Sequence, residues 1–303
     1  MKAAIYFNEL QPLLYGYYIC KGVIFLHRKI SAAVFTVLTA MFMCGCTSDK
    51  NTVGQSAGHN DRGGVTPAET AFLTDGKEKV CYGQGYETDS DNRPVGAIQA
   101  QKKYGSYGGR FIFGKDDRTI RLTFDEGYEN GCTGKILDIL KEKNVTATFY
   151  VTLDYVKSSP ELVQRMINEG HEVGNHSCTH PSLPDISDDM VFEEIHGLET
   201  YISDNFGGYK TVTMRPPRGE FSVRTLRIAK NMGYDTVLWS FAYNDWNTDA
   251  QPDRDTAYRR ITSATHNGAV YLLHAVSETN TAILPDVIDY WLDNGYTVKS
   301  ISG

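Results

Sequence analysis

From about residue 118, segments with the pattern of strands alternate strictly with segments with the pattern of helices, and this order constrains the fold more than any other feature. Strict alternation favours parallel strands joined by right-handed crossover helices. β-branched and aromatic residues predict strands, and helical periodicity with end signals predicts helices. We therefore expect an α/β fold, a distorted and incomplete (β/α) barrel of about seven parallel strands. The predicted strands are 119–124, 147–152, 171–174, 212–215, 236–240, 269–274 and 297–301, and the predicted helices are 134–143, 160–169, 188–206, 222–232, 254–265 and 281–294.

The segment before this alternation has a different character. Residues 1–46 contain a basic flank, His27-Arg28-Lys29, an apolar run over 30–43, and Gly45-Cys46. A basic flank, a short apolar run and small residues are typical of an export signal, and this one resembles a bacterial lipoprotein signal with Cys46 as the lipid-bearing residue. An uncleaved anchor helix is the alternative. We expect residues 47–117 to form a flexible tether and N-terminal extension, and 118–303 to form the main domain.

Composition excludes several classes of protein. The net charge is −7 and the hydrophobic content is 41%, so neither nucleic acid nor a multi-span membrane fold is indicated. Beyond residue 46 the chain has three cysteines, Cys81, Cys132 and Cys178, without the spacing of a zinc site. A disulfide between Cys132 and Cys178 is one interpretation, and free cysteines that act as small hydrophobic side chains are the other.

Ionisable residues stand at the ends of five predicted strands, and the carboxyl ends of parallel strands are where barrels of this kind carry their chemistry. His176 and His180 are four residues apart, which would place both imidazoles on one face of a helical turn and suits a shared metal ion. Each group alone has an ordinary structural explanation, such as an acidic turn or a core histidine. Five of them at one rim favour an active site. The groups are Asp125-Glu126, His176 with His180, Arg215-Pro216-Pro217-Arg218-Gly219, Asp245-Trp246 and Leu272-Leu273-His274.

In this order, the five motifs resemble those of the NodB-type polysaccharide deacetylases, carbohydrate esterase family 4. The resemblance covers about residues 118–302. Within the family, the segments around 124–131, 215–219 and 269–274 resemble the delta-lactam-biosynthetic de-N-acetylases. That resemblance implies hydrolysis of the N-acetyl group of N-acetylmuramic acid in the peptidoglycan of spore cortex, with closure of the freed amine to a muramic lactam.

The resemblance also implies roles for individual residues. Asp125 is expected to be the general base, held ionised by Arg215, and His274 the general acid, supported by Asp245. His176 and His180 are expected to bind a divalent metal ion, most simply zinc. Glu126 is a weaker candidate ligand, because the family usually has Asp at this position and the delta-lactam branch Asn. Tyr150 or a neighbour is expected to contact substrate through a backbone N–H, and Trp246 and Leu272 are expected to wall the acetyl pocket. Separately, a site that selects muramic acid needs a cation for the lactyl carboxylate, and we expect Arg218 to supply it. The alternative is a surface arginine paired with a neighbouring acid.

Two other functions stay open at this stage. One is a deacetylase of N-acetylglucosamine in peptidoglycan or chitin-like glycans, and the other is a glycan-binding protein with an inactive site. In each case we expect a monomer that contacts glycan strands, does not bind nucleic acid, and meets the membrane only through its N-terminal segment. The expected location is the outer face of the bacterial cytoplasmic membrane.

Overall fold

The computed structural model describes residues 76–303, so the predicted export signal with Cys46 and the first part of the tether lie outside the described residues. The main sheet is parallel throughout and runs in the order β10-β3-β4-β5-β6-β8-β2, with β9 pairing with β3 as well. All seven predicted strands are present, and the predicted incomplete barrel is confirmed. The strands of this sheet are β2 (Gly109–Arg110), β3 (Thr119–Glu126), β4 (Thr148–Val151), β5 (Glu172–Asn175), β6 (Thr213–Met214), β8 (Asp235–Val237), β9 (Val270–His274) and β10 (Thr297–Lys299).

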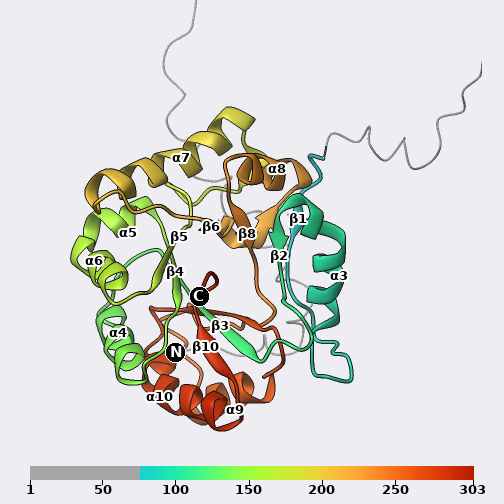
Figure 1. Ribbon diagram of the computed structural model, residues 1–303, viewed down its shortest axis with the longest axis vertical. Helices are drawn as coiled ribbons and strands as arrows, with labels where there is room; N and C mark the ends of the chain where they lie inside the picture. Colours follow the sequence, from blue (N-terminus) through green and yellow to red (C-terminus); the bar gives the residue numbers. More distant parts are fainter. Residues whose placement is uncertain (1–75) are drawn as a thin grey trace, which may run out of the picture. The chain divides into compact units, whose positions relative to one another are not determined.

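Helices lie around the outside of this sheet (Figure 1). Their starts follow from local sequence: Pro160 opens one helix at its first position, and the side chain of Ser187 accepts a hydrogen bond from the N–H of Met190 at the start of another. The helices are α3 (Val95–Tyr104), α4 (Thr133–Glu142), α5 (Leu153–Ser158), α6 (Pro160–Asn168), α7 (Asp188–Asn205), α8 (Val223–Asn231), α9 (Arg254–Ser263) and α10 (Glu278–Asp293), and the 3-10 turns are η1 (Gly105–Tyr107), η2 (Leu183–Asp185) and η3 (Pro217–Gly219). No helix in the described part of the chain is long and apolar enough to span a membrane.

Residues 76–117 belong to the folded domain. Strand β2 is an edge of the main sheet, and α3 packs into a hydrophobic cluster with Phe111 and Phe221. Strand β1 (Val80–Cys81) pairs antiparallel with β7 (Glu220–Phe221), directly after the Arg215–Gly219 motif. Part of the expected N-terminal extension therefore supplies an edge strand of the main sheet and a helix packed beside it.

Alternate side chains of a strand point to opposite faces of the sheet, and in β3 and β4 one face meets the hydrophobic core and the other meets the candidate site. Phe124 and Phe149 stack at 5.2 Å in the large hydrophobic cluster shared with the helices. Their neighbours Asp125 and Tyr150 have the opposite orientation, because side chains alternate along a strand. Asp125 therefore lies on the face of β3 opposite to the large hydrophobic cluster. An isolated parallel bridge between Phe241 and Tyr271 connects the segment after β8 to β9.

Cys132 and Cys178 do not form a disulfide. Cys132 is buried in the hydrophobic cluster and Cys178 packs against its edge. The interpretation of these two residues as small hydrophobic side chains is therefore confirmed.

Candidate active site

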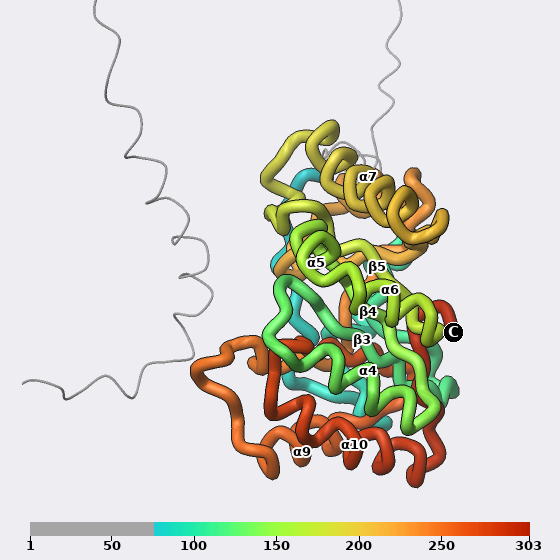
Figure 2. The backbone as a smooth tube through the Cα atoms, turned by 90° about the vertical axis from the view of Figure 1, so that its left-hand side faces the viewer, coloured from blue at the N-terminus to red at the C-terminus, as the bar shows by residue number. Residues whose placement is uncertain are grey.

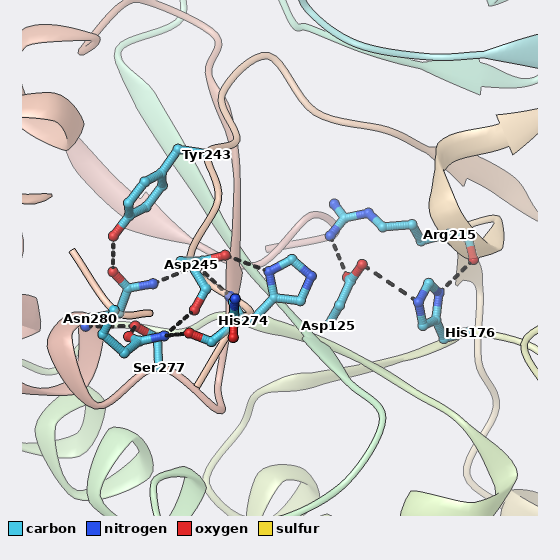
Figure 3. Close-up of polar contacts among 10 residues, drawn as sticks. Asp125, His176, Arg215, Tyr243, Asp245, His274, Ser277 and Asn280 are labelled. Atoms are coloured by element: carbon cyan, nitrogen blue, oxygen red, sulfur yellow. Dashed lines mark hydrogen bonds and ion pairs between the residues drawn. The ribbon is translucent and has the colours of Figure 1, made fainter. Parts of the chain in front are cut away.

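Asp125 of β3 and Arg215, which directly follows β6, form a buried ion pair (Figure 3). Nη1 of Arg215 donates a hydrogen bond to Oδ1 of Asp125 at 2.7 Å. Burial alone would raise the pKa of Asp125, but the charge and hydrogen bond of Arg215, together with the nearby His176 and His274, outweigh burial and hold the pKa below its usual value. Asp125 is therefore a carboxylate at neutral pH, with one oxygen occupied by Arg215 and the other available for proton transfer.

Arg215 is completely buried, and the barrel interior fixes its position. Its Nε donates to the carbonyl oxygen of Val237 at 3.1 Å, and its guanidinium group lies 4.3 Å from the centre of the Tyr150 ring. Tyr150 is fully buried, and its hydroxyl donates to Oγ1 of Thr213. At Tyr150, β4 pairs on both sides, and the Tyr150 ring lies against Arg215. The expected contact of its backbone N–H, or that of a neighbour, with substrate stays a prediction.

His176 and His180 approach each other, although the segment between them is not helical. Their ring centres lie 4.9 Å apart, nearly perpendicular. Oδ1 of Asn175 accepts from the N–H of Ser177, and Oγ of Ser177 accepts from the N–H of His180. Ser177 and His180 both have positive φ, at 68° and 57°. A strained, hydrogen-bonded turn replaces the expected helical turn, and such strain concentrates at functional sites.

The protonation state of the two histidines suits a metal ion. Burial lowers the pKa of His176, and burial lowers the pKa of His180 to about 4, so both rings are neutral. Nδ1 of His176 lies 2.8 Å from the carbonyl oxygen of Arg215 and so donates to it, which leaves Nε2 as an acceptor. That nitrogen faces Oδ2 of Asp125 at 3.5 Å. Two acceptors that face each other need a cation or a proton nearby, and neutral imidazoles are good zinc ligands.

The structure does not bring Glu126 to the histidines. Glu126 is fully buried and its carboxyl group contacts Oγ1 of Thr133 at 3.4 Å, at the start of α4. Burial raises its pKa well above the usual value, and the neighbouring Glu129 and Asp125 add to that rise. Among residues 76–303, no three His, Cys, Asp or Glu side chains are arranged to hold one ion. An ion at this position would meet two imidazole nitrogens, and its remaining ligands would come from water or substrate.

His274, at the end of β9, lies on the other side of the site. Its Nδ1 is 2.7 Å from Oδ1 of Asp245, and its backbone N–H donates to Oδ2 of the same carboxylate at 2.9 Å. Burial lowers the pKa of His274, but the charge and hydrogen bond of Asp245 outweigh burial, and the net pKa is raised. The second ring nitrogen points toward Asp125 (Figure 3). The site therefore has a carboxylate on one side and, on the other, a histidine with a raised pKa.

The remaining predicted residues lie around this centre. Arg218 is exposed, has a left-handed backbone with φ of 60°, and lies near enough to His180 to lower the pKa of that histidine. Trp246 is 54% exposed and so lies at the surface beside Asp245. Leu272 is buried and packs in one cluster with Trp239, below the rim. In Figure 2 the segment after β3 and the loop before α9 project on the same side of the barrel.

Sequence reasoning missed two residues in the site. Asn280 and Tyr243 form a buried chain of hydrogen bonds behind Asp245. Asn280 lies in the first turn of α10 and Tyr243 in the loop after β8. Neither belongs to a motif, and the partners are 37 residues apart in the chain, so no local signal could have connected them.

Comparison with known proteins agrees with the geometry. The family described as "Polysaccharide deacetylase" matches residues 114–237. The peptidoglycan-N-acetylmuramic acid deacetylase PdaA of Bacillus subtilis is 40% identical over 218 residues, which are 72% of this chain and 83% of PdaA. An uncharacterised 30.6 kDa protein of Geobacillus stearothermophilus is 41% identical over 72% of this chain and 82% of its own length.

Comparison with solved structures also finds carbohydrate esterases of family 4. The structure of Bacillus subtilis PdaA, a family 4 carbohydrate esterase, matches with a TM-score of 0.71 and 38% identity, over 75% of this chain and 96% of that one. A family 4 carbohydrate esterase from Bacillus anthracis matches with a TM-score of 0.62 and 37% identity, over 75% and 95% of the two chains. The described domain therefore has both the sequence and the fold of these proteins over most of their lengths.

Proposed function

The chain belongs to the polysaccharide deacetylases of carbohydrate esterase family 4, hydrolases of the N-acetyl amide bond, and from this we propose that it deacetylates N-acetylmuramic acid in peptidoglycan. We further propose that the freed amine closes to muramic delta-lactam in the spore cortex. The likeness to PdaA supports this substrate. The observation that carries the proposal is the exposed guanidinium group of Arg218 beside the site.

We propose that the two sides of the site move protons in opposite directions. Asp125 takes a proton from the attacking water, since Arg215 keeps it ionised and leaves Oδ2 available. His274, kept protonated by Asp245, gives a proton to the sugar nitrogen as the amide bond breaks. The two groups face each other across the site (Figure 3), so one substrate amide can contact both.

The proposed cofactor is a divalent ion, most simply zinc, held by His176 and His180. When bound, such an ion polarises the acetyl carbonyl and lowers the pKa of a coordinated water. The turn through Ser177 orients both imidazoles, and the bond from Nδ1 of His176 to the Arg215 carbonyl directs Nε2 into the site. Replacement of either histidine by Ala should abolish bound metal as measured by elemental analysis.

Two features of Arg218 favour the assignment of N-acetylmuramic acid as the substrate. Among the described residues, no salt bridge pairs Arg218 with an acid, so its guanidinium is available to a ligand. Its backbone is left-handed, a conformation that costs roughly 1–2 kcal/mol for a residue other than glycine. Muramic acid differs from glucosamine by a lactyl ether, and a peptide-free lactyl group ends in a carboxylate that Arg binds through two parallel hydrogen bonds.

The test is the replacement Arg218→Met, with Arg259→Met as the matched control. Arg259 is an exposed arginine on α9, away from the motifs. Acetate release is measured on peptide-free muramic acid glycans and on N-acetylglucosamine oligomers. We expect kcat/KM on the muramic substrate to fall at least tenfold and that on the glucosamine oligomer to change little. An equal loss on both substrates, or none on either, contradicts the assignment, and greater activity of the unaltered enzyme on glucosamine oligomers indicates the alternative substrate.

For location, we propose export and anchoring at the outer face of the cytoplasmic membrane through a lipid on Cys46 or through an uncleaved N-terminal helix. The basic flank and the apolar run before Gly45-Cys46 support this. Cys46→Ala should release the protein from the membrane fraction if the lipid is the anchor. Retention of this variant in the membrane would favour the helix.

A further inference from the structure

Behind the His274–Asp245 pair, a buried chain of hydrogen bonds leads away from the site (Figure 3). Nδ2 of Asn280 donates to Oδ2 of Asp245 at 2.5 Å, and the hydroxyl of Tyr243 donates to Oδ1 of Asn280. Asn280 is 2% exposed and Asp245 is 1% exposed. Bulk water therefore does not compete for these bonds, and each buried polar group depends on its partner.

The Asp245 carboxylate fixes which way the Asn280 amide faces. An ionised carboxylate only accepts hydrogen bonds, so the NH2 group of Asn280 must face it. The amide oxygen then faces the Tyr243 hydroxyl, which donates to it and anchors the amide. Asp245 then has defined roles for its oxygens: Oδ2 accepts from Asn280 and from the His274 backbone, and Oδ1 stays directed at Nδ1 of His274.

The backbone of Asp245 is held by the same part of α10. Ser277, the residue that caps α10, accepts from the N–H of Asn280 at 3.0 Å. Its hydroxyl donates to Oε1 of Gln251, and Nε2 of Gln251 donates to the carbonyl oxygen of Asp245 at 2.7 Å. The first turn of α10 thus holds both the carboxylate and the main chain of the residue that orients His274.

We propose that Asn280 is a positioning residue for the deacetylation reaction, and that Tyr243 acts through it. Asn280 does not touch substrate. It restricts rotation of the Asp245 carboxylate, so that the His274 ring is held with its proton-donating nitrogen directed into the site. This inference rests on the general acid role proposed for His274.

The test replaces Asn280 by Leu, which removes the amide while keeping a side chain of similar size. The control is Thr281→Val on the same helix, which removes a buried hydroxyl bonded to the Ser277 carbonyl oxygen and does not touch Asp245. Acetate release from the glycan is measured with the zinc-loaded enzyme. We expect Asn280→Leu to lower kcat by about tenfold to a hundredfold with KM within about twofold, as for a misplaced catalytic group.

A spectroscopic measurement separates positioning from general destabilisation. With 15N-labelled histidine, the proton on Nδ1 of His274 gives a downfield resonance because it is bonded to a carboxylate, and His274→Gln identifies this resonance by its loss. We expect the resonance to shift or broaden in Asn280→Leu and to stay unchanged in Thr281→Val. Tyr243→Phe should produce the same changes to a smaller extent, and it carries the test if Asn280→Leu does not fold.

Two results overturn the inference. The first is a kcat of Asn280→Leu that lies within twofold of the Thr281→Val control. If Asn280→Leu does not fold, the kcat of Tyr243→Phe is compared with the control instead. The other is an unchanged His274 resonance in that variant. If His274→Gln is inactive while Asn280→Leu is fully active, the positioning role of Asn280 is wrong and the general acid role of His274 is retained. If His274→Gln keeps full activity, the acid role fails and the inference fails with it.

Discussion

The contact between Gly174 and Tyr150 offers a sharp test of how the barrel interior positions the base. Gly174 faces the interior from β5, and a Cβ added there would lie 2.5 Å from two carbons of the Tyr150 ring. Ordinary contact begins at 3.4 Å, so the ring would have to move by 0.9 Å, the difference between the two distances. The ring is fully buried and lies against Arg215, so any movement displaces that arginine as well.

The cost of Gly174→Ala follows from this geometry. Gly174 is not among the residues with positive φ, so the added methyl group acts through crowding alone. Overpacking of a buried site costs about 1–3 kcal/mol. For a domain of this size each kcal/mol lowers Tm by about 2–4 °C, which gives a fall of roughly 2–12 °C. A shift of about 1 Å at Arg215 and Asp125 should also lower kcat by up to about a hundredfold.

A double-mutant cycle gives the decisive measurement. Urea unfolding is followed for Gly174→Ala alone, for Tyr150→Leu alone, and for the pair. We expect Gly174→Ala to cost about 1–3 kcal/mol when Tyr150 is present and close to nothing when Leu replaces it. An equal cost in both backgrounds would refute the reasoning, because the methyl group would then be crowding something other than the ring.

Three further predictions concern the ionisable groups. Asp125→Asn should lower kcat by about 10²–10⁴ while the metal content measured by elemental analysis is retained, and loss of the metal together with activity would contradict its role as the base. Because Asp245 raises the pKa of His274, Asp245→Asn should move the alkaline limb of the kcat profile to lower pH, and an unmoved limb would contradict the coupling. The pKa of Glu126 is higher in the folded protein than in the unfolded chain. Its contribution to stability is therefore fully present below its unfolded pKa and is lost as pH rises through its folded pKa. In chelator, Glu126→Gln should therefore gain stability over the unaltered protein as pH rises from 5 to 8, whereas a drop in metal affinity in this variant would show that Glu126 is a ligand.

The alternation of strands and helices and the polar strand ends were predictable because both depend on local pattern. The strand that ends in Asp125 carries its own signal of β-branched and aromatic residues. Strands β1, β2 and β7 have two residues each, too few for any periodicity, and exist through the hydrogen bonds of their partners. The turn between His176 and His180 was misread because a spacing of four is shared by a helix and by a turn closed through Ser177. The role of Asn280 depends on residues distant in the chain.

The pairing of β1 with β7 also determines how the domain would bear a mechanical load. The carbonyl oxygen of Gly76 accepts from the N–H of Arg224 at 2.9 Å, and the N–H of Tyr82 donates to the carbonyl oxygen of Gly219 at 3.0 Å. Tension applied to the chain ahead of Gly76 therefore enters the fold through this short antiparallel ladder, which follows directly on the turn that carries Arg218. Before it reaches the main sheet, such a pull acts on the loop proposed to recognise the substrate.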